Sequence, residues 1–356
     1  MLSNTTSSQR LKPRLLNILM LRFIPLLFIT LPCTCDRALK KGIKDNGRKG
    51  LALLPLLLLT FTPLLLRAQK DDNLREVVTK TIEDTYRYKP GSELAVEGEK
   101  AEIFVETWDK QKISVKIVMT ARHPKLEQAE EDLKNLDYIS EVAGQKIFLK
   151  NKLVDKTKRS SSELTVHYYI TLPEECPVYL KSHFGGATIS NLRNQLRING
   201  EFSAINIDNV QGILDIRSRF GDITGERIDG NVSINSRRSD INLYDIGGTF
   251  DITAVYGELK ISPNLSLRDL HINADKSDVY LYEPLNGEGL AYDLSLNNGE
   301  MKMPDGRKII KMEQTREVQR YAIRPSQERM GTITASVSFG DLYLQKQEKE
   351  LKARRF

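Results

Sequence analysis

The sequence has few of the residues on which most site chemistry depends. Its 356 residues include three cysteines, four histidines and one tryptophan. Cys33 and Cys35 lie near the start, so Cys176 is the single thiol of residues 69–356 and an internal disulfide is excluded there. The histidines show no metal-ligand spacing, and no nucleophile-elbow, P-loop or dinucleotide-binding glycine pattern stands between a strand and a helix. We therefore expect no catalytic residues and no bound cofactor, and we do not expect an enzyme.

An excess of positive charge is also missing where a fold is expected. The chain has 53 Lys and Arg against 47 Asp and Glu, but 11 of these basic residues and only two of the acidic ones lie in residues 1–68. The rest has 42 against 45, a net charge near −3. Nucleic-acid binding depends on basic side chains that neutralise phosphates, so we expect no nucleic-acid partner.

The longest apolar run lies near the start of the chain. Residues 51–66 are uncharged, follow a basic stretch and precede Arg67, Ala68 and Gln69. This order is typical of a secretory signal, and it predicts cleavage between Ala68 and Gln69. The run is shorter than the roughly 20 residues that span a bilayer, although an uncleaved membrane anchor stays an alternative. A second apolar run upstream favours the hypothesis that residues 1–38 come from a misassigned start codon.

The most informative part of the chain is a repeat of 18 residues. Segments at this spacing are followed by two that are spaced 20 and 22 residues apart, and a last segment closes the array after a charged insertion at 304–332. Such a period predicts stacked supersecondary units. The segments begin at Val178, Leu196, Leu214, Val232, Phe250, Leu270, Tyr292 and Ile333.

Each repeat reads as two short strands joined by a tight corner. Positions 1 and 3 and then 10 and 12 are apolar, and this alternation indicates strands with one buried face. Position 8 is Gly or Ser, which predicts a corner that needs a small residue or a positive φ. Position 7 is often aromatic. Its parity with positions 1, 3 and 5 predicts that the ring points inward and packs in the core, and the alternative is a surface ladder of rings that stack on sugars. Apolar residues do not recur every six positions, which disfavours a hexapeptide-repeat acyltransferase.

These units cannot bury their apolar faces alone, so they must stack. The sequence predicts an all-β fold, a single-stranded β-helix or β-solenoid with rungs of about 18 residues and strands roughly 4.8 Å apart. The same template at 94–108 predicts an N-terminal rung, and the region 94–177 contains a small α/β insert. In that insert we expect a helix at 124–138 and strands at 113–119, 146–149 and 164–172. Residues 69–93 are expected to be a polar lead-in, 178–346 the solenoid and 347–356 a polar tail.

The corner motif resembles that of a known family. The chain has a Phe-Gly-Asp-Ile type of corner at 220–223, 256–259 and 339–342, behind a first rung that contains Val96, Gly98, Trp108 and Asp109. With the leader, this pattern is similar to the bacterial exported "putative adhesin" family over residues 94–344. The resemblance implies a β-solenoid related to autotransporter-adhesin heads, of unknown function, and it implies no catalytic residues.

Position 9 of most repeats is acidic. In a stack, these carboxylates would form a column with neighbours about 5 Å apart, which is repulsive unless it is screened or bound to cations. One interpretation is a weak Ca²⁺ site on oxygen ligands. The alternative, which we favour, is that each carboxylate accepts hydrogen bonds from the amides of its own turn. The candidate ligands are Asp222, Asp240, Glu258 and Asp278.

These observations predict an exported protein of the cell envelope that acts as an adhesin-like structural or binding module without catalytic activity. The expected location is the periplasm, the outer-membrane surface or the medium, and the expected partner is a surface glycan or an envelope protein. One alternative is a glycan-processing enzyme, for which Asp215 with Arg217 and Arg219 would supply charge on the outer face. Another is a membrane-tethered envelope sensor, if residues 51–66 remain.

Overall fold

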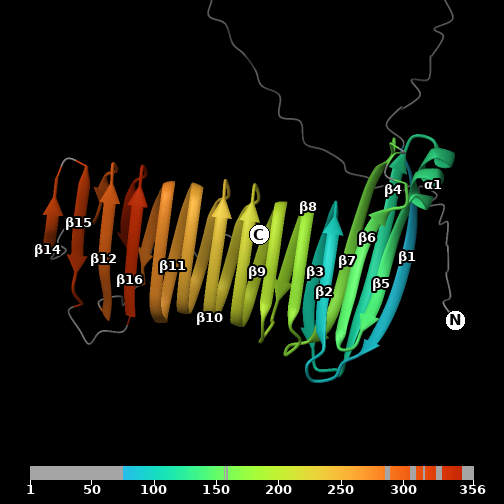
Figure 1. The fold of residues 1–356 in the computed structure, drawn as a ribbon, viewed down its shortest axis with the longest axis horizontal. Helices are drawn as coiled ribbons and strands as arrows, with labels where there is room; N and C mark the ends of the chain where they lie inside the picture. Colours follow the sequence, from blue (N-terminus) through green and yellow to red (C-terminus); the bar gives the residue numbers. More distant parts are fainter. Residues whose placement is uncertain are drawn as a thin grey trace, which may run out of the picture. The chain divides into compact units, whose positions relative to one another are not determined.

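The computed structural model of the chain describes residues 75–346, apart from 156, 158, 285–288, 305–309, 316 and 326–330. The predictions for the leader, for cleavage at Ala68 and Gln69 and for the tail at 347–356 lie outside the described residues. In the part described, 17 strands form one hydrogen-bonded sheet, accompanied by the helix α1 (Leu126–Lys134) (Figure 1). No helix among these residues is long and apolar enough to cross a bilayer.

The central strands stack in parallel with the predicted register. Val178 pairs with Leu196, and Leu214 pairs with Val232, so each residue lies beside the one 18 positions further along. The all-β, solenoid-like fold predicted from the repeat is therefore confirmed. These strands are β8 (Val178–Ser190), β9 (Leu196–Arg219), β10 (Ile223–Arg237) and β11 (Ile241–Glu283).

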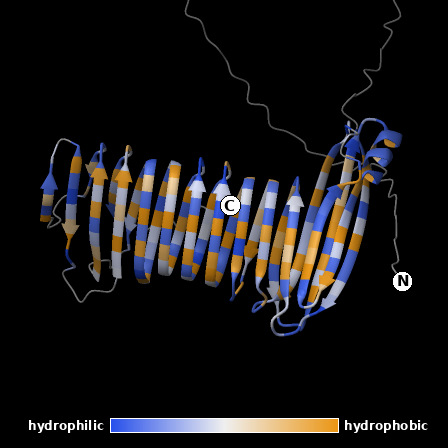
Figure 2. Ribbon diagram, viewed as in Figure 1, coloured by the Kyte–Doolittle hydropathy of each residue, from blue (hydrophilic) through white to orange (hydrophobic). Residues whose placement is uncertain are grey.

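The interior is a continuous apolar core between the sides of the rungs. Ile216, Ile223 and Ile234 are at most 1% exposed, and hydrophobic and hydrophilic residues alternate along the strands (Figure 2). Full burial of such a side chain stabilises the fold by about 1.5–3 kcal/mol. Because every rung repeats the pattern, each contributes a similar amount through its neighbours.

Each regular rung turns at three corners. Left-handed φ angles occur at position 7, as in Phe202 (+52°), at position 14, as in Asn209 (+52°), and at position 17, as in Gly212 (+132°). The small residue at position 8 has another cause. A Cβ on Gly221 would lie 2.1 Å from the carbonyl oxygen of Ser203 on the neighbouring rung, so the backbones approach too closely for a side chain.

The residues of the α/β insert belong to the same stack. The rung formed by β2 and β3 pairs with β8 on one side and with β6 and β7 on the other. Antiparallel strands β4, β1 and β5 complete this end. The bounds are β1 (Glu76–Arg87), β2 (Glu93–Glu99), β3 (Ala101–Trp108), β4 (Lys112–His123), β5 (Leu136–Ala143), β6 (Lys146–Leu153) and β7 (Glu163–Pro173).

Two local expectations at this end differ from the structure. The expected helix at 124–138 ends at Lys134, because Leu136 begins strand β5, which contains the aromatic and β-branched residues that favour strands. The expected polar lead-in contains strand β1, in which Val78 and Ile82 are half-buried. These two apolar residues are four positions apart, so they lie on the same face of a strand at the end of the stack.

The last repeat does not close the stack, contrary to the sequence-based expectation. Ile333 of β16 pairs with Leu270 of β11 on one side and with Tyr292 of β12 on the other, so the final rung lies between two earlier ones (Figure 1). An antiparallel hairpin of β14 and β15 covers the free edge of β12, as edge protection requires. The bounds are β12 (Leu290–Asn297), β13 (Met301–Lys302), β14 (Ile310–Gln314), β15 (Val318–Ile323), β16 (Gly331–Ser338) and β17 (Leu342–Lys346).

Candidate functional site

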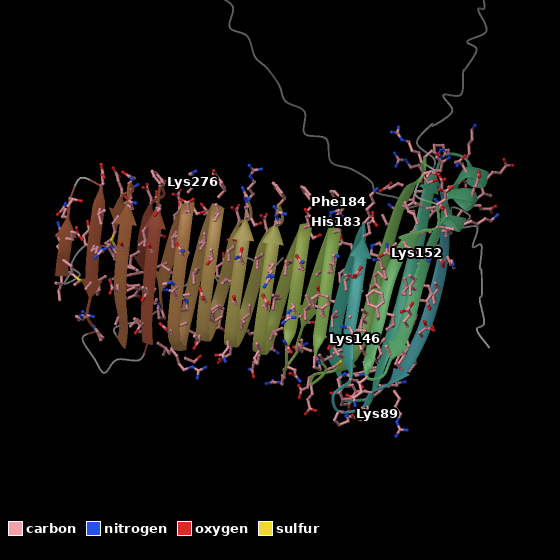
Figure 3. All side chains as sticks on the ribbon, viewed as in Figure 1. Lys89, Lys146, Lys152, His183, Phe184 and Lys276 are labelled. Atoms are coloured by element: carbon pink, nitrogen blue, oxygen red, sulfur yellow. The ribbon has the colours of Figure 1, made fainter. Side chains whose placement is uncertain are left out.

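The most distinctive surface feature is a column of large side chains along the position-7 corners, which we call the corner column. Successive members lie on neighbouring rungs, and Phe184 and Lys276 stand at the same edge of the strands in Figure 3. Every member has φ between +50° and +61°. In spatial order the members are Lys100, Phe184, Phe202, Phe220, Arg238, Tyr256, Lys276, Phe339 and Asn298.

The prediction that these aromatic residues point inward was wrong. Phe184 is 48% exposed, Phe202 is 42% exposed and Phe220 is 38% exposed. Parity along a strand assigns a face only while the backbone stays extended. The left-handed conformation at position 7 ends the alternation and turns the side chain outward.

The side chains of the corner column stack on one another. The ring centroids of Phe184 and Phe202 are 4.9 Å apart, and those of Phe202 and Phe220 are 4.7 Å apart, with interplanar angles of 8° and 4°. The guanidinium of Arg238 lies 5.3 Å from the Phe220 centroid and 5.8 Å from that of Tyr256. Because neighbours occupy the ring faces, the column presents ring edges and cationic groups to solvent.

The ends of this aromatic run are polar. The Nζ of Lys276 donates to the Tyr256 hydroxyl at 3.1 Å, and this hydrogen bond raises the pKa of Lys276. At the other end the His183 ring meets Phe184 edge to face, with centroids 4.3 Å apart, and its Nε2 lies 3.3 Å from Glu201 Oε2. The column therefore combines apolar edges with fixed polar groups along one line.

The backbone of the corner column is strained. A left-handed conformation costs an L-residue about 1–2 kcal/mol, and glycine or asparagine is the usual choice there. Here Asn298 follows that preference, whereas four phenylalanines and a tyrosine do not. Aromatic stacking returns about 0.5–1.5 kcal/mol per pair, which is of the same size as this cost. The combination of bulky side chains, exposure and left-handed backbone makes this column the candidate surface.

A cluster of arginines lies beside the corner column, on the side that precedes the corner. Arg219 and Arg237 are direct partners in the parallel register, and both are exposed. Within the described chain, no acidic group lies within ion-pair distance of either. Arg217, two residues before Arg219, lies 3.5 Å from Asp215, which also pairs with Arg197 at 3.3 Å. Asp215, which sequence reasoning considered for catalysis, is thus held between arginines.

The acidic column at position 9 lies on the other side of the corner. The backbone N–H of Asp240 donates to Asp222 Oδ1 at 3.0 Å, and that of Glu258 donates to Asp240 Oδ1 at 2.9 Å. Asp278 likewise accepts from the N–H of Asp341 at 2.9 Å. The amide partners therefore belong to the neighbouring rung rather than to the residue's own turn. Over the described ranges, no three His, Cys, Asp or Glu residues are grouped to hold a metal ion, and Ca²⁺ binding stays a prediction.

A second stacked column, which sequence reasoning missed, lies at position 11 of the C-terminal rungs. The rings of Tyr280 and Tyr343 are parallel with centroids 4.4 Å apart, and burial raises the pKa of Tyr280. Lys260 and Lys302 lie over the outer ring faces, at 5.8 Å and 4.7 Å from the centroids. Both tyrosines occupy position 11 of their repeats, and this shared position could have suggested the column. The contact between Tyr280 and Tyr343 could not be predicted, because it depends on the order of the last rungs.

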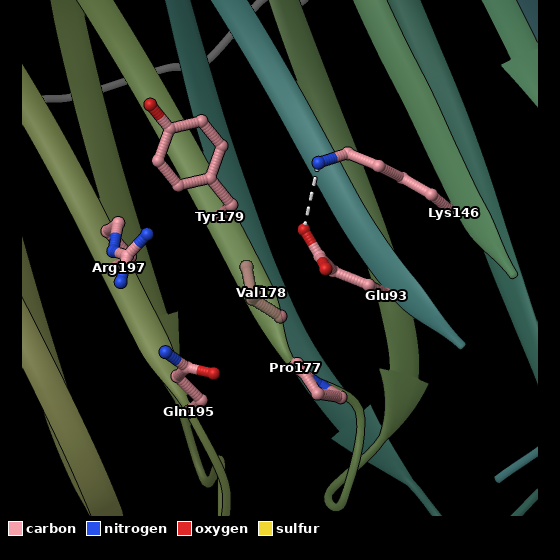
Figure 4. A pocket seen from close by; sticks show the side chains of 7 residues that line it. All are labelled: Glu93, Lys146, Pro177, Val178, Tyr179, Gln195 and Arg197. Carbon is pink, nitrogen blue, oxygen red and sulfur yellow. Dashed lines mark hydrogen bonds and ion pairs between the residues drawn. The ribbon is translucent and has the colours of Figure 1, made fainter. Parts of the chain in front are cut away.

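Pockets in the described part of the chain are shallow. One of about 160 Å³ opens between N-terminal rungs, and its single carboxylate, Glu93, pairs with Lys146 at 3.1 Å (Figure 4). A neighbouring depression of about 300 Å³ contains Glu97, which pairs with Lys150 at 2.6 Å. The first pocket lies away from the aromatic run of the corner column, whereas the second is also lined by His183 and Glu201, the neighbours of Phe184 and Phe202. The remaining residues that line the first pocket are Pro177, Val178, Tyr179, Gln195 and Arg197.

The stack and its outward-facing columns define a class of repetitive β-solenoid whose candidate site is an extended surface. The family model described as Toastrack DUF4097 matches residues 91–345, and the chain belongs to that family. This confirms the resemblance drawn from the corner motif. No curated protein matches the chain.

Several solved structures are similar to the chain. One is titled a putative adhesin from Bacteroides fragilis (11% identity, 75% of this chain and 97% of that chain covered, TM-score 0.44). Another is titled a putative adhesin from Parabacteroides merdae (10%, 75% and 95%, TM-score 0.41). A third is titled a putative lipid binding protein from Parabacteroides distasonis (14%, 76% and 97%, TM-score 0.38).

Proposed function

We propose that this chain is an exported, non-catalytic binding module of the cell envelope, which holds an extended partner along the corner column. The observation that carries the proposal is the line of exposed, stacked aromatic and cationic side chains held at left-handed φ angles. A merely structural corner would be satisfied by glycine or asparagine, as at Asn298.

The geometry of the column favours an extended partner. The stacked rings are spaced by 4.7–4.9 Å, so the surface offers similar contacts at each rung. Each contact is shallow, and affinity comes from several of them acting together on one partner. A surface glycan or an envelope protein is a partner of this kind.

We propose a non-catalytic module because of the partners that the described carboxylates have. Glycoside hydrolysis needs two carboxyl groups that face each other across a bond, about 5–9.5 Å apart. Along the corner, Asp222, Asp240 and Asp278 accept backbone hydrogen bonds. Of the four carboxylates that line the two pockets, Glu93, Glu97 and Glu201 pair with Lys146, Lys150 and His183, and the fourth is Glu99. We therefore assign the paired carboxylates to structural contacts within the stack.

Export rests on the leader and is tested by cell fractionation with intact mass measurement. A periplasmic, surface or secreted species that starts at Gln69 supports an exported module. A membrane species that retains residues 51–66 contradicts cleavage and means that the solenoid is tethered.

Binding is tested by co-sedimentation of the full chain with purified envelope polysaccharides and envelope proteins. We expect Phe202→Ala and Phe220→Ala to lose retention. The matched control is Tyr169→Ala, which removes a 46% exposed ring that stacks on Phe104 at 5.3 Å outside the corner column. Equal retention of all variants, or equal loss in the control, would contradict the proposal.

A further inference from the structure

We infer that the partner of the corner column is an acidic polysaccharide, whose anionic groups are bound by Arg219, Arg237 and Arg238. This inference rests on the proposed function and specifies the chemistry of its partner. Its basis is the arginine cluster of Arg219 and Arg237, which form no ion pair with other residues that the structure describes.

The placement of these arginines is unfavourable in the absence of an anion. Arg219 and Arg237 are opposite each other on neighbouring strands, an arrangement that destabilises a sheet when the charges are alike. Neither has an acidic ion-pair partner among the residues that the structure describes, and Glu201, at the same position on the rung before Arg219, pairs with His183 at 3.3 Å instead. Arg238 adds a third cation at the adjacent corner, between the rings of Phe220 and Tyr256. An oxyanion held between the first two would remove their repulsion.

The guanidinium group also specifies the kind of anion. Its planar fork forms paired hydrogen bonds with carboxylate or phosphate, and it is easier to desolvate than an ammonium group. Arg219 and Arg237 lie on adjacent rungs about 4.8 Å apart, so the anions of one or two neighbouring units of a polymer can contact both guanidinium groups. The ring faces are occupied by stacking, so the exposed edges of Phe202 and Phe220 beside the arginines offer apolar van der Waals contact to sugar units.

The acidic column sets the position of such a polymer. Asp222 and Asp240 lie on the opposite side of the corner, where they repel an anionic chain. The favourable path therefore runs parallel to the stack, over the arginines and the ring edges. With a net charge near −3 outside the first 68 residues, the attraction must come from this local cluster.

The test is calorimetric titration of the full chain with three probes: oligogalacturonate, its fully methyl-esterified form and linear polyphosphate. We expect one anionic probe to bind and the neutral ester to bind at least about tenfold more weakly. Binding of oligogalacturonate alone identifies a carboxylate polymer, and binding of polyphosphate alone identifies a phosphate-bearing one. Binding of both probes supports an anionic partner, and their affinities show whether carboxylate or phosphate is preferred.

Variants assign the binding to the cluster. Arg219→Gln with Arg237→Gln should weaken binding at least about tenfold, whereas the matched double change Arg122→Gln with Arg268→Gln should alter it less than about twofold. Arg237→Glu, whose neighbours in the register are Arg219 and Val255, should form an ion pair with Arg219 across the strands, so it should raise the Tm while it abolishes binding. That variant separates loss of the site from loss of the fold.

The outcomes separate this inference from the proposed function. Equal binding of the neutral ester, no binding of either anionic probe, or equal loss in the Arg122 and Arg268 control overturns the inference. If the chain then still binds envelope polysaccharide or protein and Phe202→Ala abolishes that binding, the proposed function stands. If Phe202→Ala binds like the wild type, the proposed function fails as well.

Discussion

Replacing Phe202 with asparagine separates a structural role of the corner column from a binding role. The ring stacks on Phe184 and Phe220, and losing two aromatic pairs costs about 1–3 kcal/mol. The ring is 42% exposed, so loss of its buried part costs about 1 kcal/mol more. Asparagine tolerates the left-handed φ of +52° and relieves about 1–2 kcal/mol of strain. The expected net loss of stability is therefore about 1–2 kcal/mol.

The assay is urea denaturation of wild type, Phe202→Asn and Phe250→Ala, followed by circular dichroism. Phe250 is 1% exposed in the core, and its truncation should cost about 3–5 kcal/mol. We expect Phe202→Asn to lose less than half as much, with an unchanged m-value, and to lose binding to envelope material. A loss as large as that of Phe250→Ala would refute the reasoning, because the column would then be needed to hold the fold together.

Three further predictions test the stack itself. Ile216→Asp should lower the free energy of unfolding by about 4 kcal/mol or more at pH 7, because burial raises the pKa of the new carboxyl group. The exposed control Asn235→Asp should lower it by less than about 1 kcal/mol. In urea denaturation, the loss in Ile216→Asp should shrink as the pH falls toward 4, where the carboxyl of the unfolded chain also takes up a proton. Gly221→Ala should lower the Tm by an amount equivalent to about 1–3 kcal/mol, since its Cβ would lie 2.1 Å from a backbone oxygen, and an unchanged Tm would argue against the close approach. Cys176 is buried, and desolvation raises the pKa of its thiol to about 12, so a thiol reagent at pH 8 should label it only after unfolding; rapid labelling of native protein would contradict its burial.

The regular part of the fold was predictable from local pattern. A period of 18 residues places Leu196 beside Leu214, and the alternation of apolar residues fixes which side chains face the core. The order of the last rungs was not predictable in this way. Every rung offers a similar apolar template, so the pattern is equally satisfied whether Ile333 pairs beyond Tyr292 or between Leu270 and Tyr292. The two arrangements differ only in which strands pair in the folded chain, and the repeat pattern does not determine that pairing.

The candidate site was predictable in part. The 18-residue offset already places Arg219 opposite Arg237, so the arginine cluster was legible in the sequence. The outward direction of Phe202 was not, because a left-handed corner breaks the parity that assigns faces. The acidic residues were correctly identified as a column, but their amide partners on the neighbouring rung depend on how closely the rungs approach.

The central claim is that the corner column is the binding surface, and a hydroxyl-radical footprint tests it most directly. The full chain would be oxidised free and bound to purified envelope material, and the modified aromatic residues would be quantified by mass spectrometry. The account predicts that Phe184, Phe202, Phe220 and Tyr256 become protected while Tyr169 and Tyr280 do not change. Protection of Tyr169 or Tyr280 with unchanged oxidation of the corner column would contradict it.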